Sequence, residues 1–496
     1  MALPIKQQDF SGGMISVNTS LAPANTVDLL LNMDADIEIG SAVSRLGTAT
    51  IGAQLVSGKT ILGLAQHIDV DTPGNNKLFA TLNAAGDATS VIYDVIAGST
   101  TQTGLTASTK MRFLTYNGAT LAINGADAER SYTSGGWITT GGAFDLANIP
   151  SSNKVNLCIE FLDRVYLAGD TAHLTRLYYS GVSNGSTVSW TVGNGYVDIE
   201  SEDAGGPITA LGKVPGYILV FKERSMHRWN FSSAFPESLI QIGTPSQESV
   251  VMGGGLCAFY SNSNEGAKGF YITNGGRPEC ISQDNTRPIK KWVDAISSSN
   301  EANIAGWATD RYFCWSVGDL TVDGETYTNV VLKYNRLLNQ WSMRTYPQYF
   351  KVFTNYLVSS VNTTVGGGND GTVYRMDKQG VYTDATTTTT KGFVWKVRQH
   401  HKNYDDNHQK KLSDSVVIRG KNLPSARISA YIDEILTPIE INQKTFLSKV
   451  LNVLGAGKTI KGTTISIEVA GESNGSQSFV REIEMENLTA DKNYGV

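Results

Sequence analysis

The sequence is poor in charged residues, proline and cysteine. Only 18% of its 496 residues are Asp, Glu, Lys or Arg, with 13 prolines and 4 cysteines, whereas average proteins carry about 25% charged residues. The formal net charge is −5, so the chain lacks the basic excess of proteins that grip duplex DNA. The cysteines are widely spaced without a Cys-x-x-Cys pair, which argues against a zinc ribbon or disulfide framework and predicts free, buried thiols.

Long apolar runs are also missing. No stretch of about 20 apolar residues occurs, so no membrane span is expected. Residues 1–8 lack the basic-then-apolar layout of a secretory signal, and we expect a soluble chain made in the cytoplasm. A hydrophobic fraction of 41% at this low net charge argues against disorder.

The sequence is rich in glycine, with 50 residues, and aromatic side chains make up 9%. This composition favours short strands joined by tight turns. Between residues 55 and 385, apolar runs and turns recur in units that start near Ile61, Met111, Leu157, Ile208, Val250, Ile304 and Phe350. Their mean spacing of about 48 residues matches a four-stranded propeller blade of about 40–50 residues.

We therefore predict an all-β chain with a six- or seven-bladed β-propeller at residues 55–385. Residues 1–54 show no sustained period and predict an extended N-terminal arm. Six and seven blades both stay open, because the arm could donate a strand that closes the circle. After the Thr-rich tract at 384–390, alternating runs predict a C-terminal antiparallel β-sandwich at residues 386–496.

One segment inside the propeller has a helical period. Ile289, Trp292, Val293 and Ile296 follow the i, i+3, i+4, i+7 pattern, with Thr286 upstream as an N-cap. The apolar face of this short helix either docks on the propeller or contacts a partner subunit.

Aromatic side chains fall late in several units. Trp137, Trp190, Trp229 and Trp341 are examples. We interpret them as packing between adjacent blades. The alternative is an aromatic platform for sugars or bases.

The only distinctly basic stretch follows the propeller. It contains nine cations: Lys391, Lys396, Arg398, Lys402, Lys410, Lys411, Arg419, Lys421 and Arg427. One hypothesis is that this stretch contacts DNA phosphates.

Motifs for chemistry are weak. Residues 455–459 resemble a phosphate loop, but Asn452 stands where a Walker loop needs glycine. His400, His401 and His408 form the densest histidine cluster, yet neighbouring residues on a strand point to opposite faces. We read them as solvated or interface histidines. No nucleophile elbow or catalytic triad can be assembled. We predict no catalytic, cofactor-binding or metal-ligating residues, no cofactor and no enzymatic activity.

Two stretches carry a family resemblance. The first comprises Phe-Ser-Gly-Gly-Met at 10–14, Leu-Leu-Leu-Asn-Met-Asp at 29–34 and Arg-Leu-Gly at 45–47. The second spans 176–225 and includes Tyr-Val-Asp-Ile-Glu at 196–200. Together they resemble the tail nozzle proteins of short-tailed double-stranded DNA bacteriophages, also described as tail tubular, tail hub or packaged-DNA-stabilising proteins. The Thr-rich tract and the C-terminal region depart from the family pattern.

The resemblance implies a structural role in the virion tail, in a protein assembled in the host cytoplasm. Members of the family form a ring, typically a hexamer, below the portal and adaptor proteins of the head-to-tail connection. The ring continues the DNA ejection channel, helps to retain packaged DNA and offers surfaces for tail fibres or spikes. Genomic double-stranded DNA would pass without sequence-specific binding. The alternative function is a tail receptor-binding propeller that binds or cleaves host glycans.

Overall fold

The structure is a computed structural model of the chain. It describes residues 5–16, 22–38, 40–69, 72–149, 154–183, 187–199, 206–233, 235–263, 266–283, 288–358, 361–400, 402–403, 411–413, 415–423, 426–432, 441–442, 451–452, 460–462, 464–473, 475–486 and 489–490.

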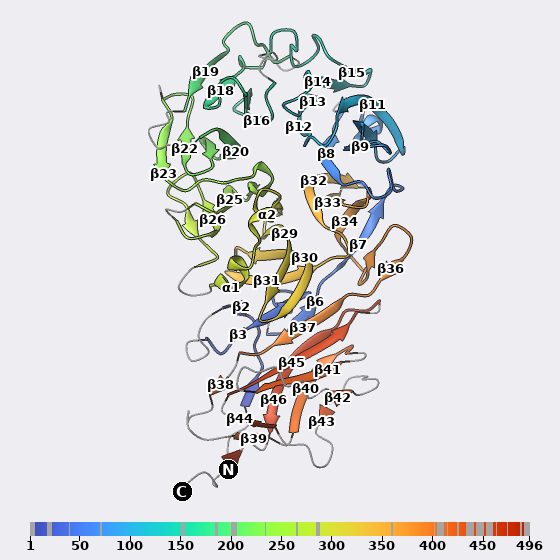
Figure 1. Cartoon of the computed structure of the whole chain (residues 1–496), viewed down its shortest axis with the longest axis vertical. Coiled ribbons are helices and arrows are strands. Elements are labelled where there is room, and N and C mark those ends of the chain that lie inside the picture. Colours follow the sequence, from blue (N-terminus) through green and yellow to red (C-terminus); the bar gives the residue numbers. More distant parts are fainter. Residues whose placement is uncertain are drawn as a thin grey trace.

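Within these ranges, seven successive groups of four antiparallel strands surround a common centre (Figure 1). We call them blades one to seven. Blade one is β8 (Ile61–His67), β9 (Lys77–Asn83), β10 (Thr89–Asp94) and β11 (Ser99–Thr106). Blade two is β12 (Arg112–Tyr116), β13 (Ala119–Ile123), β14 (Arg130–Thr133) and β15 (Gly136–Ile138). Blade three is β16 (Leu157–Phe161), β17 (Arg164–Ala168), β18 (Arg176–Tyr179) and β19 (Gly195–Asp198).

The remaining blades follow the same order of strands. Blade four is β20 (Ile208–Val214), β21 (Tyr217–Lys222), β22 (Met226–Trp229) and β23 (Glu237–Ile240). Blade five is β24 (Val251–Gly253), β25 (Leu256–Ser261), β26 (Gly269–Thr273) and β27 (Glu279–Cys280). Blade six is β28 (Ala305–Ala308), β29 (Tyr312–Val322), β30 (Glu325–Asn335) and β31 (Gln340–Thr345). Blade seven is β32 (Phe350–Val358), β33 (Val361–Gly368), β34 (Val373–Lys378) and, from the arm, β7 (Gly47–Ile51).

The arrangement is a β-propeller, and the prediction of an all-β propeller fold is confirmed. The first strand of every blade begins at the predicted residue or one residue later. The arm supplies the last strand of blade seven, where Ile51 pairs with Val373 and Thr50 with Tyr374. The circle is therefore closed by a segment that precedes it in sequence.

The arm also joins the propeller to the C-terminal region. Its strand β4 (Leu29–Leu31) lies between β31 of blade six and β37 (Val394–Arg398). Leu31 pairs with Met343 on one side and with Lys396 on the other. Beyond β37 the same sheet continues through β45 (Thr464–Glu472), β41 (Arg427–Ile432) and β42 (Ile441–Asn442), with β38 (Lys402–Asn403) also on β45. One ten-stranded sheet thus runs from the propeller into the C-terminal region.

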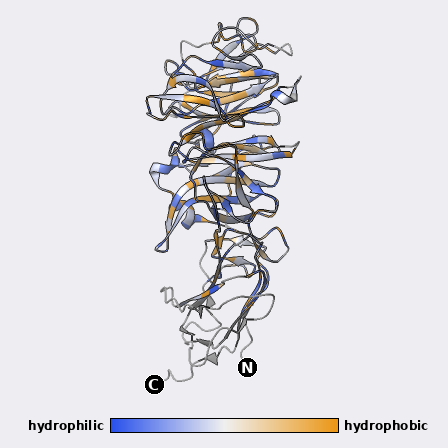
Figure 2. Cartoon of the chain, turned by 90° about the vertical axis from the view of Figure 1, so that its right-hand side faces the viewer, coloured by the Kyte–Doolittle hydropathy of each residue, from blue (hydrophilic) through white to orange (hydrophobic). Residues whose placement is uncertain are grey.

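A second C-terminal sheet also contains arm strands. Its order is β43 (Leu451–Asn452), β40 (Ser415–Lys421), β46 (Phe479–Glu486), β6 (Ala42–Ser44) and β5 (Met33–Asp34), with β1 (Ile5–Gln7) on β46. The short pairs are β2 (Gly13–Met14) with β3 (Thr26–Val27) and β35 (Asp384–Ala385) with β36 (Thr390–Lys391). A three-stranded sheet is β44 (Ile460–Gly462), β39 (Lys411–Ser413) and β47 (Thr489–Ala490). Seen from the side, the propeller occupies one end of an elongated chain and the C-terminal sheets the other (Figure 2).

The largest hydrophobic core lies where these parts meet. It includes Phe10 and Leu30 of the arm, Trp315 of blade six, and Trp395 and Val469 of the C-terminal sheet, all at most 1% exposed. Burying large apolar side chains from three parts of the chain in one cluster makes their relative positions mutually dependent.

The predicted helix is present as α1 (Lys290–Asp294), followed by α2 (Ser298–Glu301). The four apolar residues of the predicted pattern, two in α1 and two beside it, are at most 2% exposed, and the Trp292 ring lies 5.6 Å from that of Tyr327 in an edge contact. The apolar face therefore packs in the chain's own core, as the docking interpretation expects. Thr286 lies outside the described residues. Two 3-10 turns, η2 (Pro73–Asn75) and η4 (Gln247–Ser249), complete the described helical elements. In the described part of the chain, no helix is long and apolar enough to cross a membrane.

The late tryptophans mostly pack inside the protein. Trp190, Trp229 and Trp341 are at most 5% exposed, and Trp137 is half-buried beside Phe79. All four cysteines are free thiols, with Cys257 and Cys314 buried and the other two half-buried. Burial raises the pKa of Cys257 to about 12, which keeps this thiol protonated and unreactive at neutral pH.

Candidate functional site at the axis of the propeller

The first strands of the blades surround the propeller axis. Each contacts the first strand of the next blade, from β8 through β12, β16, β20, β24 and β28 to β32, which contacts β8 again. Side chains on these inner strands therefore line the space around the propeller axis. Concave spaces of this kind, enclosed by several elements, are where ligand sites generally form.

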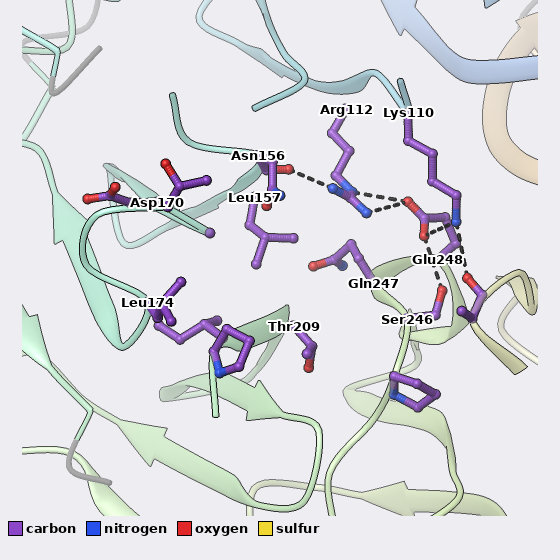
Figure 3. A pocket seen from close by; sticks show the side chains of 16 residues that line it. Lys110, Arg112, Asn156, Leu157, Asp170, Leu174, Thr209, Ser246, Gln247 and Glu248 are labelled. Atoms are coloured by element: carbon purple, nitrogen blue, oxygen red, sulfur yellow. Dashed lines mark hydrogen bonds and ion pairs between the residues drawn. The ribbon is translucent and has the colours of Figure 1, made fainter. Parts of the chain in front are cut away.

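An ion pair crosses the axis. Glu248, in the turn η4 between blades four and five, reaches Arg112 of blade two and Lys110, which lies two residues before that blade (Figure 3). The Nζ of Lys110 lies 3.0 Å from Glu248 Oε2, and the Nη2 of Arg112 lies 2.9 Å from Glu248 Oε1. Blade two lies across the circle of blades from η4. The three side chains therefore connect distant parts of the propeller.

Backbone groups fix both ends of this bridge. Arg112 donates from Nη1 to the carbonyl of Asn156 at 2.9 Å, and Lys110 donates to the carbonyl of Ala302 at 3.2 Å. On the other side, Gln247 is held by two hydrogen bonds with the backbone of Leu211, at 2.7 Å and 3.0 Å. The bridge is thus built on rigid strands and a pinned turn rather than on free side chains.

The electrostatics keep Glu248 charged. Burial alone would raise the pKa of its carboxyl group, but attraction to Arg112 and Lys110, together with the Lys110 hydrogen bond, lowers the pKa to about 2. The carboxylate is therefore ionised throughout the ordinary pH range. A group of this kind can hold structure, and it cannot act as a general acid near neutral pH.

The bridge divides the axial space into two cavities. Arg112, Gln247 and Glu248 line both of them. One cavity, of about 350 Å³, lies where the first strands begin and is lined by polar residues such as Asp170 and Thr209 (Figure 3). The other, of about 640 Å³, lies mainly along β8, β12 and β32 and is also lined by single residues of β16, β24 and β28. Arg112 and Glu248 of the bridge, together with Gln247, form the partition between them, whereas Lys110 lines only the smaller cavity.

Asp170 is the second carboxylate of the smaller cavity. It accepts hydrogen bonds from the hydroxyl of Tyr178 at 2.5 Å and from the backbone N–H of Ala172 at 2.6 Å, and it lies 2.9 Å from His173 Nδ1. Burial would raise its pKa, but these hydrogen bonds outweigh burial and lower the pKa. Both carboxylates of this cavity are therefore held in the charged form.

A separate polar cluster fixes the arm. The guanidinium of Arg45 is fully buried and donates to both carboxylate oxygens of Asp384, at 2.9 Å and 2.5 Å. The rings of Tyr346 and Phe393 lie 4.3 Å and 4.0 Å from the guanidinium carbon. The arginine of the Arg-Leu-Gly turn thus connects arm, propeller and C-terminal region.

The histidine cluster was predicted to be solvated or at an interface, and this is wrong for His400. Its side chain is 3% exposed, and its Nε2 lies 3.3 Å from Thr26 Oγ1 of the arm. The expectation failed because His400 follows β37, which pairs with strand β4 of the arm, so the arm covers the His400 side chain. His401 and His408 lie outside the described residues. Within the described ranges, no three His, Cys, Asp or Glu side chains form a group that could hold a metal ion.

Part of the basic stretch is already neutralised. Arg398 is 4% exposed and lies 2.7 Å from Glu468 and 2.9 Å from Glu325. Lys396 pairs with Glu325 at 3.2 Å, and Arg419 pairs with Glu482. These cations bind carboxylates of neighbouring strands, which weakens the hypothesis of a DNA-contacting surface. The remaining cations are exposed or have side chains outside the described part: Lys391, Lys402, Lys410, Lys411, Lys421 and Arg427.

The axial bridge was not predicted from the sequence. Lys110 and Arg112 stand two apart at the entrance of a first strand, which is a weak signal for two inward-facing cations. Nothing local marks Glu248 as their partner, because the pairing depends on the closed circle.

No family model matches the chain, and no curated protein matches it. Among solved structures, YCF48 from Cyanidioschyzon merolae is similar at 10% identity and a TM-score of 0.38, with 66% of this chain and 98% of that chain covered. The Neurospora crassa Pan2 WD40 domain is similar at 6% identity and a TM-score of 0.38, with 68% and 96% covered. Similarity at this level says nothing about function.

Proposed function

We propose that this chain is a non-enzymatic structural protein of a bacteriophage tail. It forms a ring, a hexamer by resemblance, that serves as the tail nozzle or hub below the portal and adaptor proteins. In that position it continues the DNA ejection channel and helps to retain packaged DNA. The family resemblance in the sequence is the source of this proposal.

The observation that carries the proposal is the placement of the arm. The segments that resemble the family at 10–14, 29–34 and 45–47 are the ones that pack between propeller and C-terminal sheets. Strand β4 makes the two regions one continuous sheet, and Arg45 and Asp384 bind across the same junction. A subunit joined in this way is suited to bearing load along its length, as a conduit under pressure requires.

The closed axis fits the same role. Lys110, Arg112 and Glu248 cross the centre of the propeller, so DNA would pass between neighbouring chains of a ring and not through one propeller. The net charge of −5 favours passage without tight binding.

The alternative is a receptor-binding propeller that recognises host glycans. Glycan cleavage needs a carboxyl group with a raised pKa as general acid. The carboxylates of the smaller axial cavity, Glu248 and Asp170, both have lowered pKa values. If the alternative function holds, the lowered pKa values favour a propeller that binds glycans over one that cleaves them.

Assembly distinguishes the two functions. The purified chain is mixed with the portal and adaptor proteins of the same virion and imaged by electron microscopy. A ring of several copies below the adaptor supports the nozzle. A monomer or trimer that ignores the adaptor but binds a glycan array supports the alternative.

A further inference from the structure

The larger axial cavity is a cup with its own chemistry. Most of its lining comes from the first strands of blades seven, one and two, the first strands of blades three, five and six add Cys158, Met252 and Gly306, and the Arg112–Glu248 pair forms its floor. Its volume of about 640 Å³ lies within the range of about 300–1,000 Å³ typical of small-molecule sites. Met252 and Leu357, both about two-fifths exposed, line its wall. The cup is therefore large enough and accessible enough to take a ligand.

Charge narrows the class of ligand. Of the described residues that line the cup, only Arg112 and Glu248 are charged, and they bind each other at 2.9 Å. An ionic ligand would have to break that ion pair or enter the cup without a partner of opposite charge. Either case costs free energy, because a charge would be buried without a partner. The ligand that fits is uncharged.

The polar side chains of the cup restrict the chemical class of the ligand further. Gln66 accepts a hydrogen bond from the N–H of Leu357 at 3.1 Å, while its Nε2 is buried without a hydrogen-bond partner. Asn355 and Asn362 add two exposed amide side chains to the lining. A purely apolar ligand would bury these amides with nothing to bind, which costs free energy. The ligand must therefore carry hydroxyl or other hydrogen-bonding oxygens.

The apolar part of the cup's wall also restricts the ligand. Phe113 and Phe353 are half-buried aromatic rings in the lining of the cup. An aromatic face beside neutral amides suits a molecule with C–H groups on one face and hydroxyl groups around its edge. A neutral pyranose ring has this layout.

We propose that the cup binds a neutral sugar, with Gln66 Nε2, Asn355 and Asn362 hydrogen-bonded to its oxygens and Phe113 or Phe353 against its C–H face. This inference concerns one chain and does not rest on ring assembly. Its failure would leave the nozzle proposal unchanged, and failure of ring assembly would leave the sugar site unchanged.

The test is binding of the full chain to methyl pyranosides of glucose, galactose, mannose and N-acetylglucosamine. Each is titrated up to about 10 mM, roughly ten times a Kd of about 1 mM, and followed by saturation-transfer NMR. The site variant carries Asn355→Ala and Asn362→Ala, two exposed positions whose truncation leaves the core intact. The matched control is Asn274→Ala, which removes an exposed amide beyond the end of β26.

We expect saturable binding of at least one pyranoside to the natural chain and to the Asn274→Ala control. Binding to the double variant should be about tenfold weaker, because two hydrogen bonds are lost. A Gln66→Met variant should also bind the same pyranoside more weakly than the natural chain does. The proposal is overturned if no pyranoside of the panel binds, or if the double variant binds as tightly as the control.

Discussion

Asp34 of the arm and Arg344 of blade six form a buried ion pair in which Arg344 Nη2 donates to Asp34 Oδ2 at 2.8 Å. Both side chains are at most 4% exposed, and Lys333 adds a second cation 3.0 Å from the same carboxylate. Burial would raise the pKa of Asp34, but attraction to Arg344 and Lys333 holds it well below its usual range. The arm is therefore attached by charge as well as by strand pairing.

Replacing Asp34 tests this attachment. Asp34→Asn leaves Arg344 and Lys333 buried without their shared carboxylate, and we expect a loss of about 3 kcal/mol in the free energy of unfolding. Urea unfolding measures it. The control is Asp294→Asn, which breaks an exposed pair with Lys290 on the surface of α1. Equal stability of the two variants would show that the arm does not depend on Asp34.

Gly47, of the Arg-Leu-Gly turn, begins the strand that closes the propeller. A Cβ at this position would lie 1.9 Å from the carbonyl oxygen of Thr383, a backbone atom that has little freedom to move. We expect Gly47→Ala to displace β7 and lower the melting temperature by several degrees, since about 1 kcal/mol already shifts Tm measurably. Calorimetry measures the shift. In contrast, Gly86→Ala, where the added Cβ meets nothing within 4 Å, should leave Tm nearly unchanged.

The axial bridge predicts a pH dependence of stability. The pKa of Glu248 is lowered from 4.5 to about 2 in the folded chain, so its ionised form favours folding above pH 4.5. That contribution disappears as the pH falls from about 4.5 to about 2. The measurement is the free energy of unfolding of the natural chain and of Glu248→Gln at a series of pH values.

At pH 7 we expect the Glu248→Gln variant to be less stable by about 2 kcal/mol, because two charge-assisted contacts are weakened. The difference between the two proteins should shrink between pH 4.5 and 2. The surface change Glu237→Gln, at a side chain 60% exposed, serves as control. A difference that stays constant with pH would contradict the role assigned to the bridge.

Much of the propeller could be predicted from the sequence because its determinants are local. Short apolar runs bounded by glycine turns set each blade, and the first strands begin at or beside the predicted residues. That the arm could close the circle was one of two options left open by the sequence, but the segment that does so, β7, and the place of β4 could not be predicted, since their partners, such as Val373 and Lys396, lie far along the chain. The same holds for Glu248 and for buried His400, whose surroundings exist only once the circle is closed and the arm is in place.

The central claim is the tail ring, and imaging of the assembled complex tests it most directly. Cryo-electron microscopy of the natural chain bound to its portal and adaptor proteins should show a ring of several copies below the adaptor. In that ring the DNA passage should lie between chains, while each propeller axis stays closed at Lys110, Arg112 and Glu248. A chain that stays monomeric or trimeric and does not bind the adaptor would contradict the proposal.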